Sequence, residues 1–173
     1  MTESQIASFD DWMHESVKHI EWVANDLLPK PGREPRRLIG AMRYAVLGGG
    51  KRIRALLCYA AGAVSGAETT DLDRAALALE LVHAYSLVHD DMPSMDNDTL
   101  RRGKPTVHVQ YGEATAMLAG DALQTEAFTV LASMKNPVAV ARLCGTLARA
   151  AGVRGMCGGQ ALDLAMVGGH PGE

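Results

Sequence analysis

Apolar residues recur along this chain at steps of three and four positions rather than at every second position. Near the start, Ile6, Phe9, Met13, Val17 and Ile20 follow this spacing, which is typical of an amphipathic helix. With breaks at Gly- and Pro-rich segments, the pattern predicts helices over residues 4–28, 36–47, 52–64, 71–92, 112–134, 137–151 and 154–166. Because we find no alternating strand pattern with hairpin turns, we expect an all-α fold.

Two of these helices have recognisable starts, and two have an unusual composition. Asn136 is expected to cap the helix that begins with Pro137, and TTDLD at 69–73 predicts a capped start with acids in the first turn. Residues 71–92 and 112–134 are apolar on nearly all sides, as expected for helices at the centre of a bundle. We therefore expect other chains, or more of a longer protein, to cover them.

Composition and charge narrow the class of protein. With 173 residues, 47% hydrophobic and 21% charged, the chain is an ordinary globular domain. A net charge of −3 gives no general attraction to nucleic acid. The longest uncharged stretch, residues 55–67, is too short to span a membrane. Three distant cysteines and an acidic start without a signal-peptide pattern favour a cytoplasmic location.

Charged residues gather in LVHDDMPSMDNDTLRRGKP, residues 87–105, where an apolar helix ends. Pro93 disrupts helical hydrogen bonding, and the distortion could bring the carboxylates of Asp90 and Asp96 together. Two such charges 4 Å apart repel by roughly 4 kcal/mol at an effective dielectric near 20, so we expect a cation between them. Mg²⁺ fits, because it commonly binds one or two carboxylates together with substrate phosphates. A simple crowding of acids at the helix end remains the alternative, although the helix dipole disfavours it.

Basic residues form two further candidate sites. In LGGGKRIRALL, residues 47–57, glycines precede a helix start and Lys51 and Arg54 share one helix face; a phosphate site and a solvated helix start are equally compatible with this segment alone. Arg101 and Arg102 in RRGKPT suit bidentate phosphate binding. His83, seven residues before Asp90, lies on nearly the same helical stripe and is expected to face the acids.

Two weaker features complete the candidates. His89 points away from that stripe and is expected to be a packing residue. In GGQALD, residues 158–163, Gln160 and Asp163 lie one turn apart on one helix face.

Taken in this order, GGGKRIR, LVHDDMPSMDND, RRGKPT and GQALD resemble the motifs of the trans-isoprenyl diphosphate synthases, most closely the bacterial farnesyl diphosphate synthase branch. The resemblance covers the chain from about residue 36. It implies an isoprenoid-synthase-type helical bundle that forms a homodimer. It also implies Mg²⁺-dependent condensation of an allylic diphosphate with isopentenyl diphosphate.

The resemblance also assigns roles to individual residues. Asp90 and Asp96, supported by Asp91, match magnesium ligands, and Arg101 matches the arginine that grips the allylic diphosphate. The residues that match isopentenyl diphosphate ligands are Lys51, Arg54, His83 and Arg102. Gln160 matches a polar residue near the allylic site.

Product length depends on the residues just before Asp90. Tyr85 is bulky where family members that stop at fifteen carbons often carry a large side chain, and Ser86 is small. We therefore expect farnesyl rather than geranylgeranyl diphosphate as the product, with geranylgeranyl diphosphate synthase as the alternative.

The chain departs from the family after Asp163, because we find no second Asp-rich motif and no later lysine. We therefore expect residues 1–173 to be the N-terminal part of one polyprenyl synthase domain, without its C-terminal half, and to have little activity alone. Three other readings stay open: a class I terpene cyclase, which would not need a second diphosphate site, a non-catalytic prenyl-diphosphate-binding subunit, and a purely structural helical protein.

Overall fold

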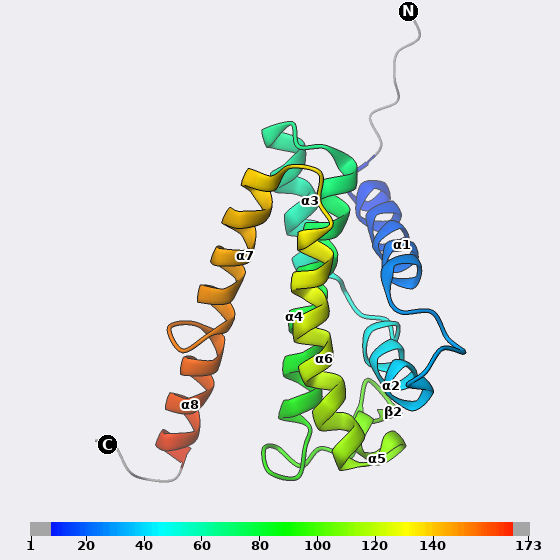
Figure 1. Ribbon diagram of the computed structural model, residues 1–173, viewed down its shortest axis with the longest axis vertical. Helices are drawn as coiled ribbons and strands as arrows, with labels where there is room; N and C mark the ends of the chain where they lie inside the picture. Colours follow the sequence, from blue (N-terminus) through cyan, green and yellow to red (C-terminus); the bar gives the residue numbers. More distant parts are fainter. Residues whose placement is uncertain (1–7, 168–173) are drawn as a thin grey trace, which may run out of the picture. The chain divides into compact units, whose positions relative to one another are not determined.

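The computed structural model describes residues 8–167, which fall into two compact units that divide after Ser133. The helices of the first unit are α1 (Phe9–Leu27), α2 (Arg36–Val46), α3 (Ile53–Ser65), α4 (Thr69–Asp90), α5 (Val107–Tyr111) and α6 (Glu113–Ala132). A two-stranded antiparallel ribbon, β1 (Leu100–Arg101) and β2 (Lys104–Pro105), lies between α4 and α5 in the sequence. The second unit contains α7 (Pro137–Ala151) and α8 (Met156–Val167) (Figure 1).

The structure confirms the all-α prediction and each of the seven predicted helices. The helix over 137–151 has the predicted bounds, and the ends of the other six are shifted. The first helix begins at Phe9 because Ser8 and Asp11 form a reciprocal capping box; positions 4–7 of the predicted helix lie outside the described residues. The five-residue α5 and the ribbon were not predicted. Both are too short to produce a hydrophobic period.

The two predictions about helix starts had different outcomes. Asn136 caps α7 as expected, since its side chain accepts hydrogen bonds from the backbone N–H groups of Val138 and Ala139. The capped start predicted within TTDLD is wrong: α4 begins at Thr69, and Glu68 at the N-cap makes no side-chain capping hydrogen bond.

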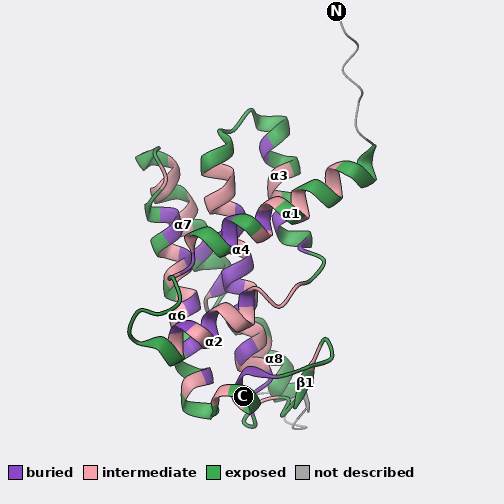
Figure 2. Ribbon diagram, turned by 90° about the vertical axis from the view of Figure 1, so that its right-hand side faces the viewer, coloured by how far each residue is buried: buried purple, intermediate pink, exposed green. Residues whose placement is uncertain are grey.

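Helix α4 occupies the centre of the first unit. It lies beside α6 in Figure 1 and also packs against α1, α2 and α3. Figure 2 shows buried residues along much of its length, with Leu77 and Leu81 completely buried. At its contact with α6, the His89 ring lies against Gly120, and its Nε2 is 3.1 Å from the Met117 carbonyl oxygen. The prediction that His89 is a packing residue is thus confirmed.

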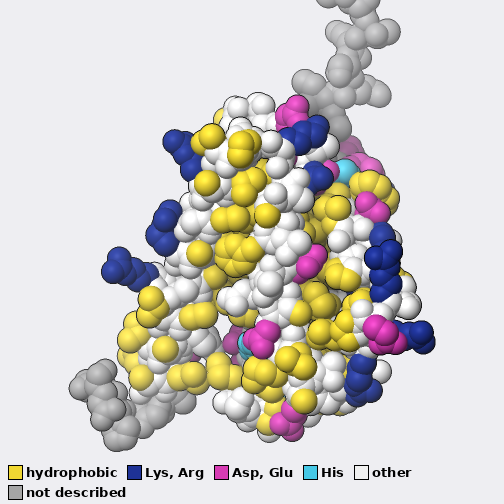
Figure 3. Space-filling model, viewed as in Figure 1, with side chains coloured by type: hydrophobic (Ala, Val, Ile, Leu, Met, Phe, Trp, Pro, Cys, Tyr) yellow, Lys and Arg dark blue, Asp and Glu magenta, His cyan; other side chains and the backbone are white. Residues whose placement is uncertain are grey.

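Helix α6 keeps an exposed apolar face. Met117 and Leu118 are exposed, and apolar side chains gather over this helix in the space-filling view of Figure 3.

Among the described residues, no helix is long and apolar enough to cross a membrane.

Candidate functional site

The acidic part of the site is a tight turn at the C-terminal end of α4. The backbone N–H of Asp96 donates to the Asp90 carbonyl oxygen at 2.9 Å. The N–H groups of Met95 and Asn97 both donate to the Met92 carbonyl, at 2.9 and 3.0 Å. The chain around Pro93 therefore folds back on the helix end. This turn brings Asp90 and Asp96 together, as the position of the proline predicted.

The electrostatics of this turn favour a cation. Burial raises the pKa of the Asp90 carboxyl, and the nearby carboxylates of Asp96 and Asp91 raise it further, while Arg101 opposes them. Asp96 is exposed, so its carboxylate can reach a ligand from solvent. Within residues 8–167, no group of three or more His, Cys, Asp or Glu forms a ready metal cage. A carboxylate pair of this kind suits an ion that takes its other ligands from water and a bound phosphate.

Asp91 has a different environment and a different partner. Its side chain is only 3% exposed. Nε of Arg101 donates to both Asp91 oxygens at 2.8 and 2.9 Å, and Nη2 donates to Oδ1 at 2.6 Å. The pair raises the pKa of the Arg101 guanidinium. Asp91 therefore holds Arg101 beside the acidic turn, and the role expected for Asp91 in support of magnesium binding stays a prediction.

The ribbon carries the two adjacent arginines. Leu100 pairs with Pro105 and Arg101 with Lys104, and the turn between the strands consists of Arg102 and Gly103 with φ of 53° and 76°. Two positive φ values suit a tight hairpin turn of this kind. The ribbon is fixed to α2, because the Tyr44 hydroxyl donates to the Pro105 carbonyl at 2.8 Å.

Arg102 leaves this turn toward the loop between α2 and α3. Its Nη1 donates to the Gly49 carbonyl oxygen. Gly50 leaves room for the guanidinium: a Cβ at this position would lie 2.5 Å from Arg102 Nη1. The glycine run that the sequence suggested as a phosphate loop therefore also holds the Arg102 guanidinium. We call Gly49 and Gly50 the seat of Arg102.

A basic cavity of about 470 Å³ lies next to this seat. Its charged and polar lining includes Lys51, Arg54, His83 and Arg102, all four residues that the resemblance assigned to one substrate. Burial lowers the pKa of His83, and the charges of Arg54 and Arg102 lower it further, while the Glu80 carboxylate opposes them. His83 thus lines the basic cavity, and the expectation from helical spacing that it faces the acids stays a prediction.

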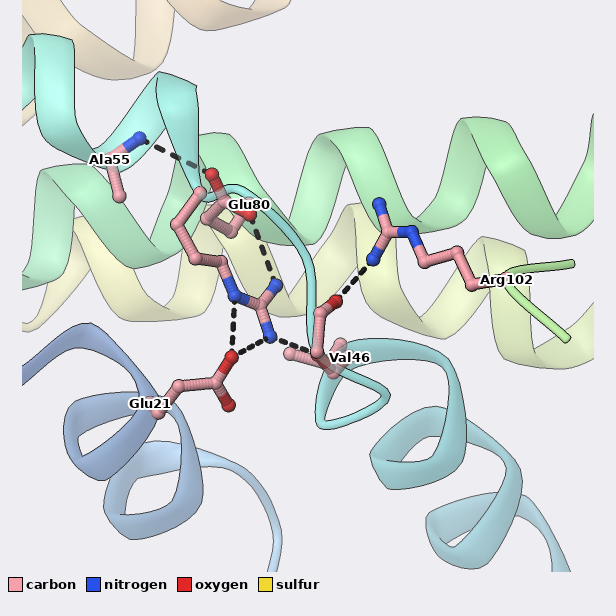
Figure 4. Close-up of polar contacts among 7 residues, drawn as sticks. Glu21, Val46, Ala55, Glu80 and Arg102 are labelled. Carbon is pink, nitrogen blue, oxygen red and sulfur yellow. Dashed lines mark hydrogen bonds and ion pairs between the residues drawn. The ribbon is translucent and has the colours of Figure 1, made fainter. Parts of the chain in front are cut away.

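Sequence reasoning missed two charged residues that also line this cavity, Arg52 and Glu80. Arg52 bonds to Glu80 and Glu21, and Figure 4 shows Glu21, Val46, Ala55 and Glu80 converging from four helices. Arg52 was missed because it lies in a basic segment of a kind that is usually exposed to solvent. Glu80 was missed because it lies in a helix that is otherwise apolar. A lone acid in an otherwise apolar stretch was the only signal of this pair in the sequence.

The remaining candidates are Tyr85, Ser86 and Gln160. The Tyr85 ring is 6% exposed and stands edge-on to His89, with centroids 5.9 Å apart. The Ser86 hydroxyl donates to the His83 carbonyl at 3.0 Å. Gln160 belongs to α8 in the second unit. The role expected for Gln160 near the allylic site stays a prediction.

The fold is that of an isoprenoid synthase. It is similar to an FPP/GFPP synthase from Zymomonas mobilis, with a TM-score of 0.89 and 44% identity over 95% of this chain and 60% of that chain. The polyprenyl synthetase family model matches residues 35–170, and the chain belongs to this family.

Two relatives are named for different products. A probable farnesyl diphosphate synthase from Bradyrhizobium diazoefficiens is 50% identical over 163 residues, which are 92% of this chain and 48% of the relative. The large subunit 1 of a heterodimeric geranylgeranyl pyrophosphate synthase from Arabidopsis thaliana chloroplasts is 45% identical over 97% of this chain and 47% of the relative. The chain thus spans about half the length of the curated relatives that it matches.

Proposed function

We propose that the chain is part of a Mg²⁺-dependent prenyltransferase that condenses dimethylallyl or geranyl diphosphate with isopentenyl diphosphate to give farnesyl diphosphate. The observation that carries this proposal is the placement of two neighbouring arginines. Arg101 stands beside the acidic turn, paired with Asp91, while Arg102 lines the basic cavity. One short ribbon thus supplies an arginine to each of two sites suited to phosphate groups, the acidic turn and the basic cavity. A reaction between two diphosphates requires two such sites.

On the acidic side, Asp90 and Asp96 would hold Mg²⁺ together with the allylic diphosphate. The metal supplies neutralisation of the negative charge that develops on the departing diphosphate. Arg101, oriented by its hydrogen bonds to Asp91, stabilises the same charge from the protein side. This stabilisation favours breaking of the allylic C–O bond, which leaves an allylic carbocation.

On the basic side, Lys51, Arg54 and Arg102 would bind the diphosphate of isopentenyl diphosphate, with His83 as a hydrogen-bonding neighbour. The double bond of this substrate attacks the carbocation and forms a carbon–carbon bond. A proton then leaves the new cation, and the released diphosphate is the base that accepts it. The apolar walls of the helices exclude water that would otherwise capture the cation.

Product length is tested at Tyr85. Its buried ring favours a fifteen-carbon product, whereas the similarity to the Arabidopsis subunit favours a twenty-carbon product. For the assay, the chain is fused to the part of the Bradyrhizobium relative that it does not match. We expect chromatography of the labelled products to show farnesyl diphosphate, and a longer product after Tyr85→Ala. An unchanged product length in an active Tyr85→Ala fusion contradicts this role for Tyr85.

The function itself is tested by ligand binding to the 173-residue chain, which we expect to have little turnover alone. Calorimetry should detect isopentenyl diphosphate binding that Lys51→Ala with Arg54→Ala weakens at least about tenfold, since two charge-assisted contacts are lost. The control, Lys18→Ala with Arg36→Ala, removes the same charges from exposed positions on α1 and α2. Equal affinities in both double variants would exclude the basic cavity as the substrate site.

The same experiments separate the alternatives. A terpene cyclase would bind an allylic diphosphate but not isopentenyl diphosphate. A non-catalytic subunit would bind both, and its fusion would give no product. The homodimer and the cytoplasmic location implied by the family stay predictions, and light scattering of the purified chain measures the first of them.

A further inference from the structure

Arg52 stands in sequence between Lys51 and Arg54, but its guanidinium is engaged by neighbouring protein groups. Nε and Nη2 contact Glu21 Oε1 at 2.7 and 2.6 Å, and Nη1 contacts Glu80 Oε2 at 3.1 Å. Nη2 also donates to the Val46 carbonyl oxygen at 2.6 Å. The side chain is only 7% exposed. Arg52 therefore differs from Lys51 and Arg54, which are exposed and form no ion pair within residues 8–167.

The backbone of Arg52 needs this anchoring. Its φ is 50° and its ψ 31°, the left-handed region, which a residue with a side chain adopts only when its surroundings hold it there. The left-handed residue lies at the N-cap of α3, where the chain turns from the glycine run into the helix. The directions in which Lys51 and Arg54 leave the backbone depend on this turn.

Glu80 fixes the turn from the other side. One of its oxygens binds Arg52, and the other accepts a hydrogen bond from the Ala55 backbone N–H at 3.2 Å. Arg52 makes no side-chain capping hydrogen bond of its own, so Glu80 on α4 satisfies a free N–H in the first turn of α3. Glu80 thus binds both Arg52, the N-cap residue of α3, and the first turn of α3 at Ala55 (Figure 4).

The position of Glu80 is electrostatically unexpected. The carboxylate is 4% exposed and lines a cavity that otherwise gathers cations. Its negative charge opposes the binding of an anion there. The contacts of Glu80 explain why a carboxylate lies in this cavity. From α4, Glu80 binds both the Arg52 side chain and the first turn of α3.

We infer that the Arg52–Glu80 pair positions Lys51 and Arg54 for the diphosphate of the homoallylic substrate. In this inference, which rests on the proposed function, Arg52 is a positioning residue and not a ligand. The phosphate groups are bound by its two neighbours, and Arg52 with Glu80 determines where those neighbours point.

Two other roles make different predictions for Glu80→Gln, a nearly isosteric change. If the charge of Glu80 acts only by repelling the anion, the variant binds diphosphate more tightly than the parent chain. If the pair only stabilises the fold, the folded variant binds with unchanged affinity. If the pair positions the ligands, affinity falls although a negative charge has been removed from the cavity.

The experiment measures binding of inorganic diphosphate to the 173-residue chain by calorimetry, with circular dichroism melts to confirm that each variant is folded at the assay temperature. The variants are Glu80→Gln, Arg52→Lys and the double variant. Tyr59→Phe is the control, since it removes a 2.9 Å hydrogen bond to Asp73 that lies outside the cavity.

We expect affinity to fall about tenfold in both single variants, and the double variant to lose little more because both act through one contact. Tyr59→Phe should lower the melting temperature without changing affinity. Unchanged or tighter binding in folded Glu80→Gln overturns the inference and leaves the proposed function standing. No diphosphate binding by the parent chain overturns the proposed site, and the inference with it.

Discussion

Gly50 is the residue on which the seat of Arg102 depends. Its φ of 141° disfavours any side chain, and a Cβ there would meet the Arg102 guanidinium at 2.5 Å. We expect Gly50→Ala to displace Arg102 and weaken diphosphate binding about tenfold, through loss of one charge-assisted contact. Calorimetry with inorganic diphosphate measures this effect.

Gly49→Ala is the matched control for this prediction. Gly49 also has a positive φ, of 82°, but a Cβ there meets no atom within 4 Å. Alanine strains the backbone at either position, but only the side chain of Gly50→Ala would overlap the Arg102 guanidinium. Equal losses of affinity in the two variants would mean that strain in the loop, and not the position of Arg102, governs binding.

His83 gives a prediction about pH. Burial and the charges of Arg54 and Arg102 lower its pKa from the ordinary 6.5, so the folded protein binds this proton less readily than the unfolded chain. The contribution to stability is therefore present above pH 6.5 and is lost as pH falls from 6.5 through the folded pKa. An NMR titration of the His83 ring, assigned with His83→Gln, should give a pKa below 6.5 that rises when inorganic diphosphate is added. A ligand-free pKa at or above 6.5 contradicts this environment.

At the scale of residues, the sequence pointed to several charged groups that line the basic cavity and missed the pair that supports them. Lys51, Arg54 and Arg102 could be chosen because phosphate binding favours cations next to flexible glycines, and because the family resemblance assigned all three to one substrate. Glu80 and Arg52 could not, because their contact joins residues 28 positions apart on different helices. Local patterns contain no information on such a pairing.

At the scale of elements, the contact between α4 and α6 depends on a missing side chain. A Cβ at Gly120 would overlap the His89 ring, which lies against α6. We expect Gly120→Ala to destabilise the fold by about 1–2 kcal/mol, since overpacking costs more than the roughly 1 kcal/mol of helix propensity that alanine adds. Chemical denaturation measures the free energy of unfolding.

Gly40→Ala on α2 is the control for this change. A Cβ at Gly40 would lie 3.6 Å from the Tyr111 ring, an ordinary van der Waals distance, so the variant gains propensity without a clash. We expect it to be as stable as the parent chain or up to about 1 kcal/mol more stable. Equal stability changes in the two variants would show that the packing at Gly120 is not tight.

Helices were easier to predict than the short elements between them. The long helices could be predicted because apolar residues recur every three or four positions over several turns of each helix. The ribbon could not, since its strands have two residues each and its composition is that of a charged surface loop. The turn after α4 was predicted in part, because Pro93 marks where the helix must end, while the hydrogen bonds that close the turn depend on the folded backbone.

At the scale of the molecule, ligand binding should stabilise the whole first unit, because the acidic turn, the ribbon and the basic cavity exist only when it is folded. We expect Mg²⁺ with geranyl diphosphate to raise the melting temperature of the chain, and chelation by EDTA to reverse the shift. Asp90→Asn with Asp96→Asn should abolish the shift. Asp98→Asn, an exposed acid in the same loop, should retain it. A shift that survives the loss of Asp90 and Asp96 would place the metal elsewhere.

The ribbon described above also limits how this protein can change during evolution. Arg101 and Arg102 are consecutive residues that serve different neighbours, one at the end of a strand and one in the turn. A single inserted or deleted residue between Leu100 and Lys104 would move one arginine out of its place, whatever the new residue is. We therefore expect the length of this hairpin to tolerate change less than its composition, and the exposed Leu100 and Lys104 to be the positions that accept substitution most readily.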